Sequence, residues 1–336
     1  MKSLEFDGRT VFDLESALKQ IPYTTQANRF IGYNLILGVF KGTVEQWGKD
    51  IVAHNEWYQS LVGNYFKGPV DWLSLKDDDF SDINKLGVDD VETLYQIHTD
   101  VIRTCTAGLR DFSPGKKRSQ KNHRSVERIL YIIAEFNEEI GYYQGFDRFA
   151  YIFFIMALNF CIELGIDKDY AESMAYFMAT SIILLNGFYK HMKSEEDVTQ
   201  WIKRYQYLLE KARPEVALRL KCLGVHPLQY VFKWSALLFA DEHTPDDLFR
   251  VWDICLLHKD DFETFVFCAC IAHLWQITLS HPGDKGLLEL LTNYKSWNME
   301  ALIHDTLLFY SHAYEDRAKS TCCVNFQSFF ALEIPV

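Results

Sequence analysis

The chain has 336 residues, of which 49% are hydrophobic and 15% aromatic, so it can bury a large core, and the composition argues against a disordered chain. Its formal net charge of −12 argues against nucleic acid as the main partner, because phosphate binding draws on a clustered excess of Lys and Arg. Residues 1–7 carry charges where a secretory signal is apolar, so export is not indicated.

The cysteines indicate a reducing compartment, because most of the eight lie inside apolar segments as free thiols do. No C-x-x-C pair occurs, and Cys268 and Cys270 would point to opposite sides of a helix, so we expect no metal site. The cytoplasm is therefore the expected location. Near the end of the chain, Cys322 and Cys323 are either an acylation site or ordinary tail residues.

Glycine and proline are sparse, and apolar residues recur at spacings of three and four, which predicts an all-α fold. Residues 26–40 are predicted to form an apolar helix that ends at Gly38. The acidic residues 77–82 and the basic residues 113–124 are interpreted as solvated connections, although the basic one could also meet an acidic surface or a phosphate. Further helical patterns cover residues 45–66, 88–104, 125–136, 146–162, 180–189, 198–212, 228–240, 245–257, 262–279 and 286–291.

These helices are expected to form one domain of two lobes over residues 20–312. The strongest breaks in the helical pattern are Arg213-Pro214 and residues 224–227, so the lobes are predicted at 20–213 and 214–312. Residues 1–19 are then an N-terminal lead-in, and 313–336 a C-terminal tail. The longest uncharged apolar run, 149–162, is too short to span a bilayer comfortably and is interpreted as a buried helix.

One stretch of the predicted helices places chemically useful side chains together. At 100° per residue, Ile97, Asp100, Arg103 and Thr104 fall within about a third of the helix circumference. Asp100 is close enough to hold the Arg103 guanidinium in one orientation. Taken alone, such a pair is typical of a surface salt bridge worth a few tenths of a kcal/mol.

Signatures of several enzyme classes are missing from the chain. It contains no G-x-x-x-x-G-K-[ST] phosphate loop, no G-x-S-x-G elbow, no H-E-x-x-H and no G-x-G-x-x-G. The sequence therefore does not indicate a nucleotide-binding enzyme.

Three separated motifs instead occur in a particular order: Ile97-x-x-Asp100-x-x-Arg103-Thr104, Tyr142-x-Gln144-Gly145, and Arg250-Val251-Trp252-Asp253. Together they closely resemble the I-x-x-D-x-x-R, Y-x-Q-G and R-[IV]-W-D fingerprint of the TBC domain, the family of Rab GTPase-activating proteins. Residues 29–38 are similar to the opening R-G-x-x-W-x-x-L-L-G element of that family. The resemblance covers about residues 20–312 and implies the all-α, two-lobed TBC fold.

The resemblance assigns Arg103 as an arginine finger and Gln144 as a glutamine finger that replaces the GTPase's own water-positioning glutamine. Ile97, Asp100 and Thr104 would support the first finger, and Tyr142 would pack to hold the second finger's loop. Gly145, which has no Cβ, would let the backbone of this loop approach the partner closely. In the third motif we expect Trp252 in the core and Arg250 paired with Asp253, supporting the finger loops from behind.

The sequence departs from the family pattern at three positions. Thr106 stands where the family often has proline, and Phe146-Asp147 where it usually has Met-Asn. None of these changes removes a reacting group. They bear on the fit of the loop and on which GTPase is accepted.

The expected activity is stimulation of GTP hydrolysis by a GTP-loaded Rab-type small GTPase. The protein would need no cofactor of its own, because GTP and Mg²⁺ arrive on the partner. It would act in the cytoplasm without a transmembrane segment, with peripheral association at endomembranes as one option. A GTPase-binding scaffold of the same fold with weak or no activity is the alternative, and retention of both Arg103 and Gln144 speaks against it. A helical enzyme acting on a small molecule is a further rival, for which the sequence offers no motif.

Overall fold

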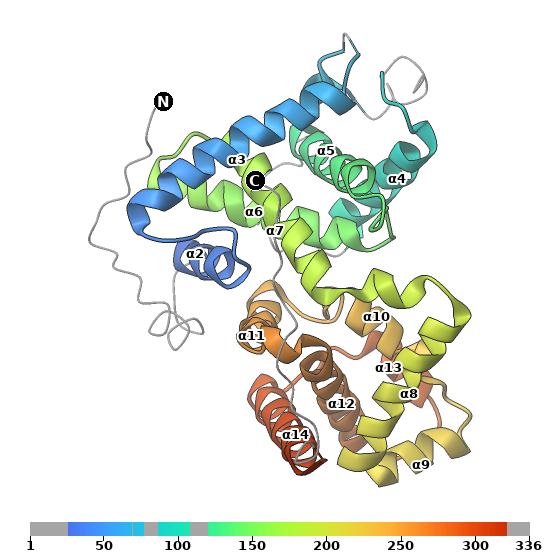
Figure 1. Cartoon of the computed structure of the whole chain (residues 1–336). Coiled ribbons are helices and arrows are strands. Elements are labelled where there is room, and N and C mark those ends of the chain that lie inside the picture. The colour runs from blue at the N-terminus through green and yellow to red at the C-terminus, as the bar shows by residue number, and fades with distance from the viewer. Residues whose placement is uncertain (1–25, 69, 77–86, 108–119, 321–336) are drawn as a thin grey trace.

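The computed structural model describes residues 26–68, 70–76, 87–107 and 120–320. Over these ranges the regular structure consists of α-helices and short 3-10 helices, with no β-strand. The helices form two groups, one above the other in Figure 1. The predicted all-α, two-lobed fold is therefore confirmed.

The first lobe is built around α6 (Phe146–Leu164) and α7 (Tyr170–Asn186), which pack along each other. Apolar residues surround most of α6, so it is stable only where neighbours cover it on every side. The predicted buried helix over 149–162 is confirmed by this packing. Besides α7, the neighbours of α6 are α2 (Gln26–Ile36), α4 (Val91–Ala107) and α5 (Gln120–Phe136). The lobe also contains α3 (Val44–Tyr65), which packs on α7, and η2 (Trp72–Ser74), which packs on α5.

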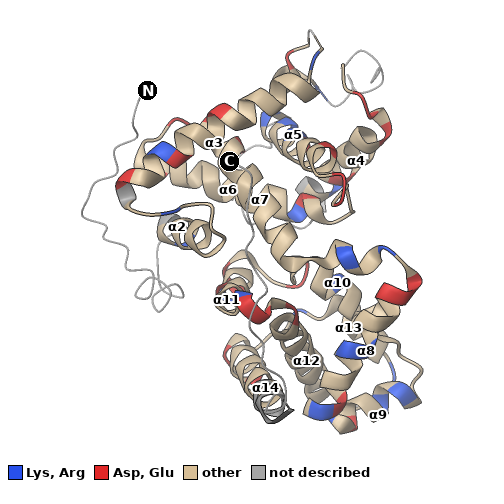
Figure 2. Ribbon diagram, viewed as in Figure 1, with Lys and Arg blue, Asp and Glu red and all other residues tan. Residues whose placement is uncertain are grey.

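The second lobe is built around α12 (Phe262–Ser280), which packs mainly on α14 (Met299–Ser320). The segment Lys259–Ser280 is long and apolar enough to cross a membrane, but 83% of its most apolar window is buried inside the fold, as in a core helix. Figure 2 shows α12 almost without charges. The lobe also contains η5 (Phe188–Met192), α8 (Glu195–Ala212), α9 (Pro214–Cys222), η6 (Pro227–Gln229), α10 (Val231–Ala236), α11 (Pro245–Leu257), η7 (Lys259–Asp261) and α13 (Leu287–Asn293).

The chain enters the second lobe after α7, earlier than the expected break at Arg213-Pro214. Gly187, with a φ of 59°, ends α7 in the left-handed conformation, and α8 then packs on α12 and α14. Pro214 lies in the first turn of α9, where backbone N–H groups have no partner within the helix, so proline costs no helical hydrogen bond there. The Arg213-Pro214 break therefore separates two helices of the same lobe.

The expected helices correspond to observed elements, and two differences have local causes. α7 begins at Tyr170, ahead of the expected 180, because residues 170–179 also face the core. α10 is shorter than expected because Leu238 and Phe239 adopt positive φ values of 45° and 63°, which no helix continues. α14 lies beyond the last expected helix.

Arg124 is buried, which corrects the expectation of a solvated loop over residues 113–124. Residues 113–119 lie outside the described part, and α5 begins at Gln120. The Arg124 Nη1 donates to Glu127 Oε2 at 2.6 Å, and Glu127 Oε1 lies 2.8 Å from His98 Nδ1 on α4. The guanidinium can be buried because a carboxylate on the next turn of α5 compensates its charge.

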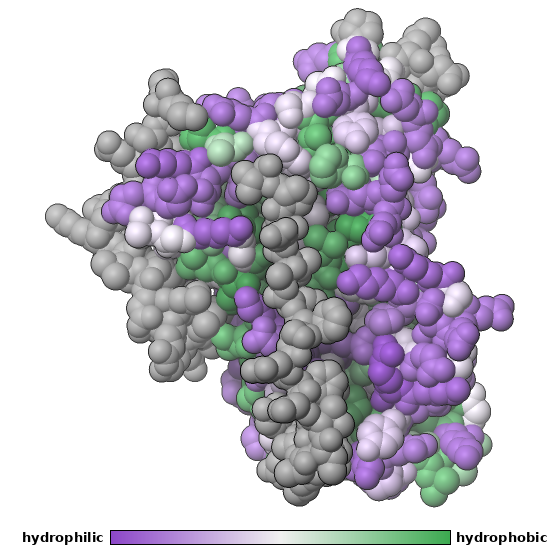
Figure 3. All heavy atoms as spheres, viewed as in Figure 1, coloured by the Kyte–Doolittle hydropathy of each residue, from purple (hydrophilic) through white to green (hydrophobic). Residues whose placement is uncertain are grey.

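Other expectations fall on residues outside the described ranges, namely the lead-in 1–19, the acidic connection 77–82, and Cys322 and Cys323. Four cysteines that the sequence placed in apolar segments are buried, as expected: Cys161, Cys255, Cys268 and Cys270. On the face drawn in Figure 3, apolar patches interrupt a mainly hydrophilic surface.

The second lobe contains a close pair of histidines, of which His273 is fully buried and His243 half-buried. His243 Nε2 lies 2.7 Å from His273 Nε2, and the His273 ring stacks on Phe239 with 4.1 Å between centroids. Burial lowers the pKa of His273 to about 3; burial, and then the charge of its neighbour, lower the pKa of His243 to about 2. Both imidazoles are therefore neutral in the folded protein near neutral pH.

We expect the free energy of unfolding to fall as pH drops below about 6.5, the ordinary histidine pKa. In that range the unfolded chain binds protons on both imidazoles and the folded chain does not, so acid favours unfolding. Each imidazole contributes up to about 1.4 kcal/mol per pH unit. Urea denaturation at pH 7 and pH 5 measures the effect. The His243→Phe variant should lose part of this dependence, whereas the exposed His304→Ala variant should keep it; equal behaviour of the two variants would contradict the assignment.

Candidate functional site

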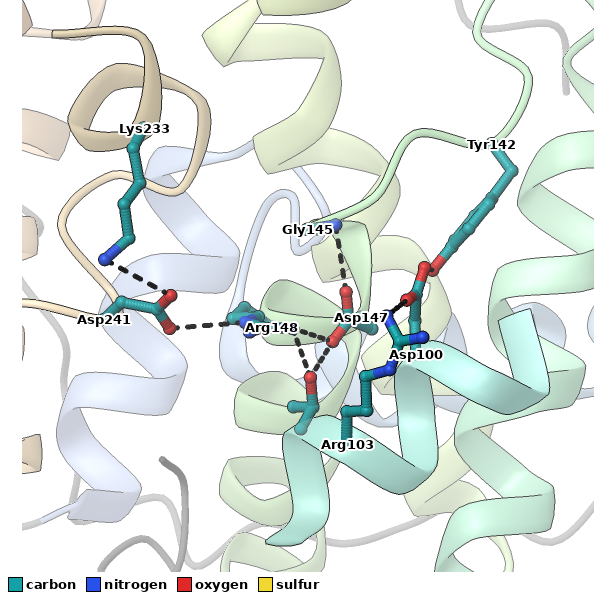
Figure 4. Close-up of polar contacts among 9 residues, drawn as sticks. Asp100, Arg103, Tyr142, Gly145, Asp147, Arg148, Lys233 and Asp241 are labelled. Carbon is teal, nitrogen blue, oxygen red and sulfur yellow. Dashed lines mark hydrogen bonds and ion pairs between the residues drawn. The ribbon is translucent and has the colours of Figure 1, made fainter. Parts of the chain in front are cut away.

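Arg103 and Asp100 form the ion pair that the sequence predicted on one face of α4. The Arg103 Nη1 lies 3.5 Å from Asp100 Oδ1. The exposed fraction of the side chain is 64% for Arg103 and 5% for Asp100, and Ile97 on the same face is fully buried. Apolar packing therefore fixes the helix and the carboxylate, while the guanidinium reaches solvent (Figure 4).

Tyr142 connects this helix to the loop that carries the second motif. Its hydroxyl donates to Asp100 Oδ2 at 3.0 Å, so the Asp100 carboxylate is shared between Tyr142 and Arg103. Burial raises the pKa of Asp100, although the Tyr142 hydrogen bond opposes the shift. Burial, together with the Asp147 and Asp100 charges, raises the pKa of Tyr142 far above its usual range, so the phenol stays a hydrogen-bond donor. This agrees with the expectation that Tyr142 holds the loop.

Gln144 lies in that loop, and its side chain is exposed. The carboxamide makes no hydrogen bond within the described residues, so both its donor and its acceptor can meet another molecule. The next residue, Gly145, is buried and has a φ of 114°, which disfavours any side chain. A Cβ on Gly145 would lie 2.3 Å from Leu237 Cδ2, so the close approach in this structure comes from the chain's own Leu237.

A second connection between the two motifs involves residues that the sequence analysis did not assign to the site. The Thr104 hydroxyl donates to Asp147 Oδ2, and Arg148 donates to both Thr104 Oγ1 and Asp147 Oδ2. Asp147 Oδ1 accepts the backbone N–H of Gly145 at 3.0 Å. Asp147 thereby links Thr104, which follows Arg103, to Gly145, which follows Gln144 (Figure 4).

The signal that could have identified these residues is the charge of Arg148 at the start of an otherwise apolar helix. A charged side chain in such a helix is normally paired when it is buried. Among the departures from the family pattern, Phe146 is buried and Asp147 caps the Gly145 turn, so both act inside the fold. Thr106 lies in α4, and its side chain is outside the described part.

The third motif lies in α11, and one of its expected contacts is wrong. Trp252 is buried as expected, and its Nε1 donates to the Leu238 carbonyl at 2.8 Å. Asp253, however, does not pair with Arg250. Arg29 of α2 binds it in a bidentate ion pair, with both N···O distances at 3.2 Å, and the Tyr33 hydroxyl donates to it at 2.7 Å.

Arg250 contacts Glu300 at the surface instead. The reason is burial: Asp253 faces α2, and the buried guanidinium of Arg29 satisfies both of its oxygens. Arg250 and Asp253, three residues apart on α11, therefore bind different partners. The third motif joins the lobes, with Asp253 as the acceptor.

The arrangement presents an exposed guanidinium and an exposed carboxamide, held from behind by buried carboxylates. Within the described residues no three His, Cys, Asp or Glu side chains lie close enough to hold a metal. A cavity of about 510 Å³ lies between α8, α12 and α14, and none of the motif residues lines it. The exposed groups of the site therefore lie outside this cavity.

Comparison with known proteins gives consistent family relationships. A family model described as the Rab-GTPase-TBC domain matches residues 56–279. TBC1 domain family member 13 of Homo sapiens is 27% identical over 156 residues, which cover 45% of this chain and 38% of that protein. The GTPase-activating protein gyp1 of Schizosaccharomyces pombe is 24% identical over 237 residues, which cover 64% of this chain and 45% of that protein. The matched region spans less than half the length of these curated relatives.

A solved structure has the same fold. The crystal structure of the Ypt/Rab-GAP domain of Gyp1p aligns with a TM-score of 0.65 and 17% sequence identity, covering 93% of this chain and 95% of that chain. At this identity the similarity concerns the fold alone. It agrees with the all-α, two-lobed architecture.

We expect Asp253→Asn to lower the free energy of unfolding by about 3 to 5 kcal/mol, because it leaves Arg29 buried without a compensating charge. Arg250→Gln in the same motif is the matched control. It should change the free energy by about 1 kcal/mol at most, since it breaks a contact with a largely exposed Glu300. Chemical denaturation at pH 7 measures both free energies. Equal effects of the two substitutions would contradict the Arg29–Asp253 assignment and favour the pairing of Arg250 with Asp253.

We expect Tyr142→Phe to destabilise the protein by about 1 to 3 kcal/mol, because the buried Asp100 loses a hydrogen-bond donor while the ring remains. Tyr95→Phe, at an exposed position of α4, the helix that carries Asp100, should stay within about 0.5 kcal/mol of the original chain. Urea titrations compare the two, and a neutral Tyr142→Phe would mean that the hydroxyl does not hold the loop.

Proposed function

This chain belongs to the Rab-GTPase-TBC domain family, and on that premise we propose that it accelerates GTP hydrolysis by a Rab-type small GTPase. One observation carries the proposal: the exposed Arg103 guanidinium is held by the buried Asp100 carboxylate, which also binds the loop that displays Gln144. The printed name of the Schizosaccharomyces pombe relative, a GTPase-activating protein, supports the same activity.

Arg103 acts as the arginine finger. Negative charge spreads over the phosphoryl oxygens in the transition state of GTP hydrolysis, and a guanidinium supplied by a second protein can raise the rate by about 10³ to 10⁵. Arginine suits the task because its charge is permanent and its donors form a planar fork that matches phosphate. The Asp100 contact orients this fork before the GTPase binds, which reduces the entropy lost on reaching the transition state.

Gln144 acts as the glutamine finger. The attacking water needs a neighbour that accepts one of its protons in a hydrogen bond and donates another hydrogen bond nearby, and a carboxamide combines both functions. The Gln144 carboxamide is exposed and makes no hydrogen bond in the described structure, so it is available for this role. Gly145 and Tyr142 on either side keep its backbone in place.

The reactants belong to the partner. GTP and Mg²⁺ arrive bound to the GTPase, and this chain supplies only side chains, with no cofactor of its own. We infer that it acts on GTP-loaded Rab proteins in the cytoplasm. It would associate peripherally with endomembranes and take part in vesicle trafficking. Each of these points depends on the GTPase-activating function.

We expect Arg103→Ala to lower stimulated hydrolysis by about 10³ or more, and Arg103→Lys to lose most of it, because lysine lacks the fork. Gln144→Ala should lower it by roughly 10²-fold, as for other single groups that stabilise a transition state. Single-turnover phosphate release from a panel of purified, GTP-loaded Rab proteins measures these rates. The Gln144 carboxamide is exposed and makes no hydrogen bond in the described structure, so Gln144→Ala should fold with unchanged stability. The Arg103 variants alter a partner of the buried Asp100, so urea denaturation of each variant accompanies the rate measurement to show that it is folded.

Matched substitutions of exposed residues on α8, Arg204→Ala and Gln200→Ala, should leave the stimulated rate unchanged. Stimulation by Arg103→Lys at the level of the unmodified chain would refute the arginine finger. Binding of GTP-loaded Rab proteins without stimulation of any of them would instead identify the chain as a scaffold.

A further inference from the structure

Arg148 lies in the first turn of α6 and contacts three segments of the chain at once. Its Nη1 donates to Thr104 on α4 and to the adjacent Asp147, and its Nε donates to Asp241 Oδ1 at 3.3 Å. The exposed fraction of its side chain is only 21%. Figure 4 shows the guanidinium between Asp147 on one side and Asp241 on the other.

Two of these contacts reach the neighbours of the proposed fingers. Thr104 directly follows Arg103, and Asp147 accepts the N–H of Gly145, which directly follows Gln144. Asp147 and Thr104 are almost completely buried, so their positions depend on one another. A displacement of the Arg148 guanidinium would therefore shift the backbone next to both Arg103 and Gln144.

The third contact reaches a connection of the second lobe that has several polar contacts of its own. Asp241 belongs to the connection between α10 and α11, where Lys295 Nζ donates to its carbonyl at 2.7 Å. The Trp297 Nε1 donates to the next carbonyl, that of Glu242, at 3.0 Å. Lys233 Nζ lies 3.7 Å from the Asp241 carboxylate on the side away from Arg148. The carboxylate is thus held in place before Arg148 binds it.

We propose that Arg148 is a positioning residue, which sets the placement of the Arg103 and Gln144 fingers relative to each other and to the second lobe through Asp241. The proposal rests on the GTPase-activating function proposed above. The guanidinium is suited to this role because it uses different nitrogens for the two lobes. A lysine has a single nitrogen and cannot serve both sides in the same geometry.

The charges around Arg148 favour a fixed geometry. Burial lowers its pKa, but the Asp147 and Asp241 charges outweigh burial, so the pKa is raised overall and the side chain is permanently charged. Within the described residues these two carboxylates are its ion-pair partners, and the Thr104 hydroxyl is its neutral acceptor. Removing either one leaves the other contact intact, which allows the two connections to be tested separately.

The test compares Asp241→Asn, Arg148→Lys and Arg148→Gln in the full chain. Single-turnover hydrolysis is measured over a range of concentrations of the chain, with the GTP-loaded Rab that the unmodified chain stimulates most. We expect the maximal rate to fall about tenfold for Asp241→Asn and about 10²-fold for Arg148→Gln, as for small misplacements of reacting groups. The half-saturating concentration should stay within about twofold.

Arg148→Lys should recover only part of the loss. The double variant Arg148→Gln with Asp241→Asn should be no slower than Arg148→Gln alone, because both changes break one chain of contacts. Arg204→Gln, which breaks a bidentate ion pair with Glu263 confined to the second lobe, is the matched control and should keep the original rate.

Arg148→Gln leaves Asp147 buried without its cation and can unfold the chain, so two further measurements keep the test decisive. Asp147→Asn with Arg148→Gln removes both charges but keeps an acceptor for the Gly145 N–H, and should fold yet remain slow. Hydrogen exchange of the Gly145 amide should become faster in Asp241→Asn while the α12 amides stay protected. This second readout does not depend on any GTPase.

Full stimulation by Asp241→Asn and by the Asp147→Asn, Arg148→Gln double variant would overturn the proposal, as would unchanged exchange at Gly145. A rise in the half-saturating concentration without a fall in the maximal rate would also overturn it, because Arg148 would then serve binding alone. If the unmodified chain stimulates no Rab protein, the proposed function fails, and the exchange experiment still decides whether Arg148 holds the loop.

Discussion

The organisation of this site depends on one buried carboxylate. Asp100 lies beneath the surface of α4, with the Arg103 guanidinium on its solvent side and the Tyr142 hydroxyl on its inner side. A carboxylate in this position cannot turn toward water, so it must keep both of its partners. The buried Asp100 charge therefore orients the exposed Arg103 guanidinium and the loop that carries Gln144. This division separates the part of the site that can meet a partner from the part that maintains its geometry.

The same principle recurs elsewhere in the molecule. Asp147 binds the loop and α4 from inside the first lobe, and Asp253 binds α2 from the second lobe. Each joins segments that are distant in sequence, and each is satisfied by a guanidinium together with a neutral donor. Such contacts are directional, whereas the apolar packing of α6 and α12 is not. They can therefore specify one relative placement of helices where hydrophobic burial alone would allow several.

The sequence was sufficient for the all-α architecture, because apolar spacing reports directly on helix faces. It was also sufficient for the Asp100–Arg103 pair, since three residues of one helix decide that contact. It did not predict the partner of Asp253, because spacing within α11 favoured Arg250 and could not reveal a distant α2. The Arg148–Asp241 pair was missed for the same reason: its residues are 93 positions apart, and only tertiary packing brings them together.

The ion pair between Arg29 and Asp253 has a consequence for how the protein is made. The two residues are 224 positions apart, two thirds of the length of the chain, and the buried charge on the first helix of the described fold is compensated only after that interval has been synthesised. At about 5 to 20 residues per second, a ribosome needs roughly 10 to 45 seconds to synthesise that interval. During this time the nascent first lobe exposes an uncovered edge of α2 and α6. Synthesis of α11 is therefore the earliest point at which the Arg29 charge can be compensated and α2 joined to the second lobe through this contact.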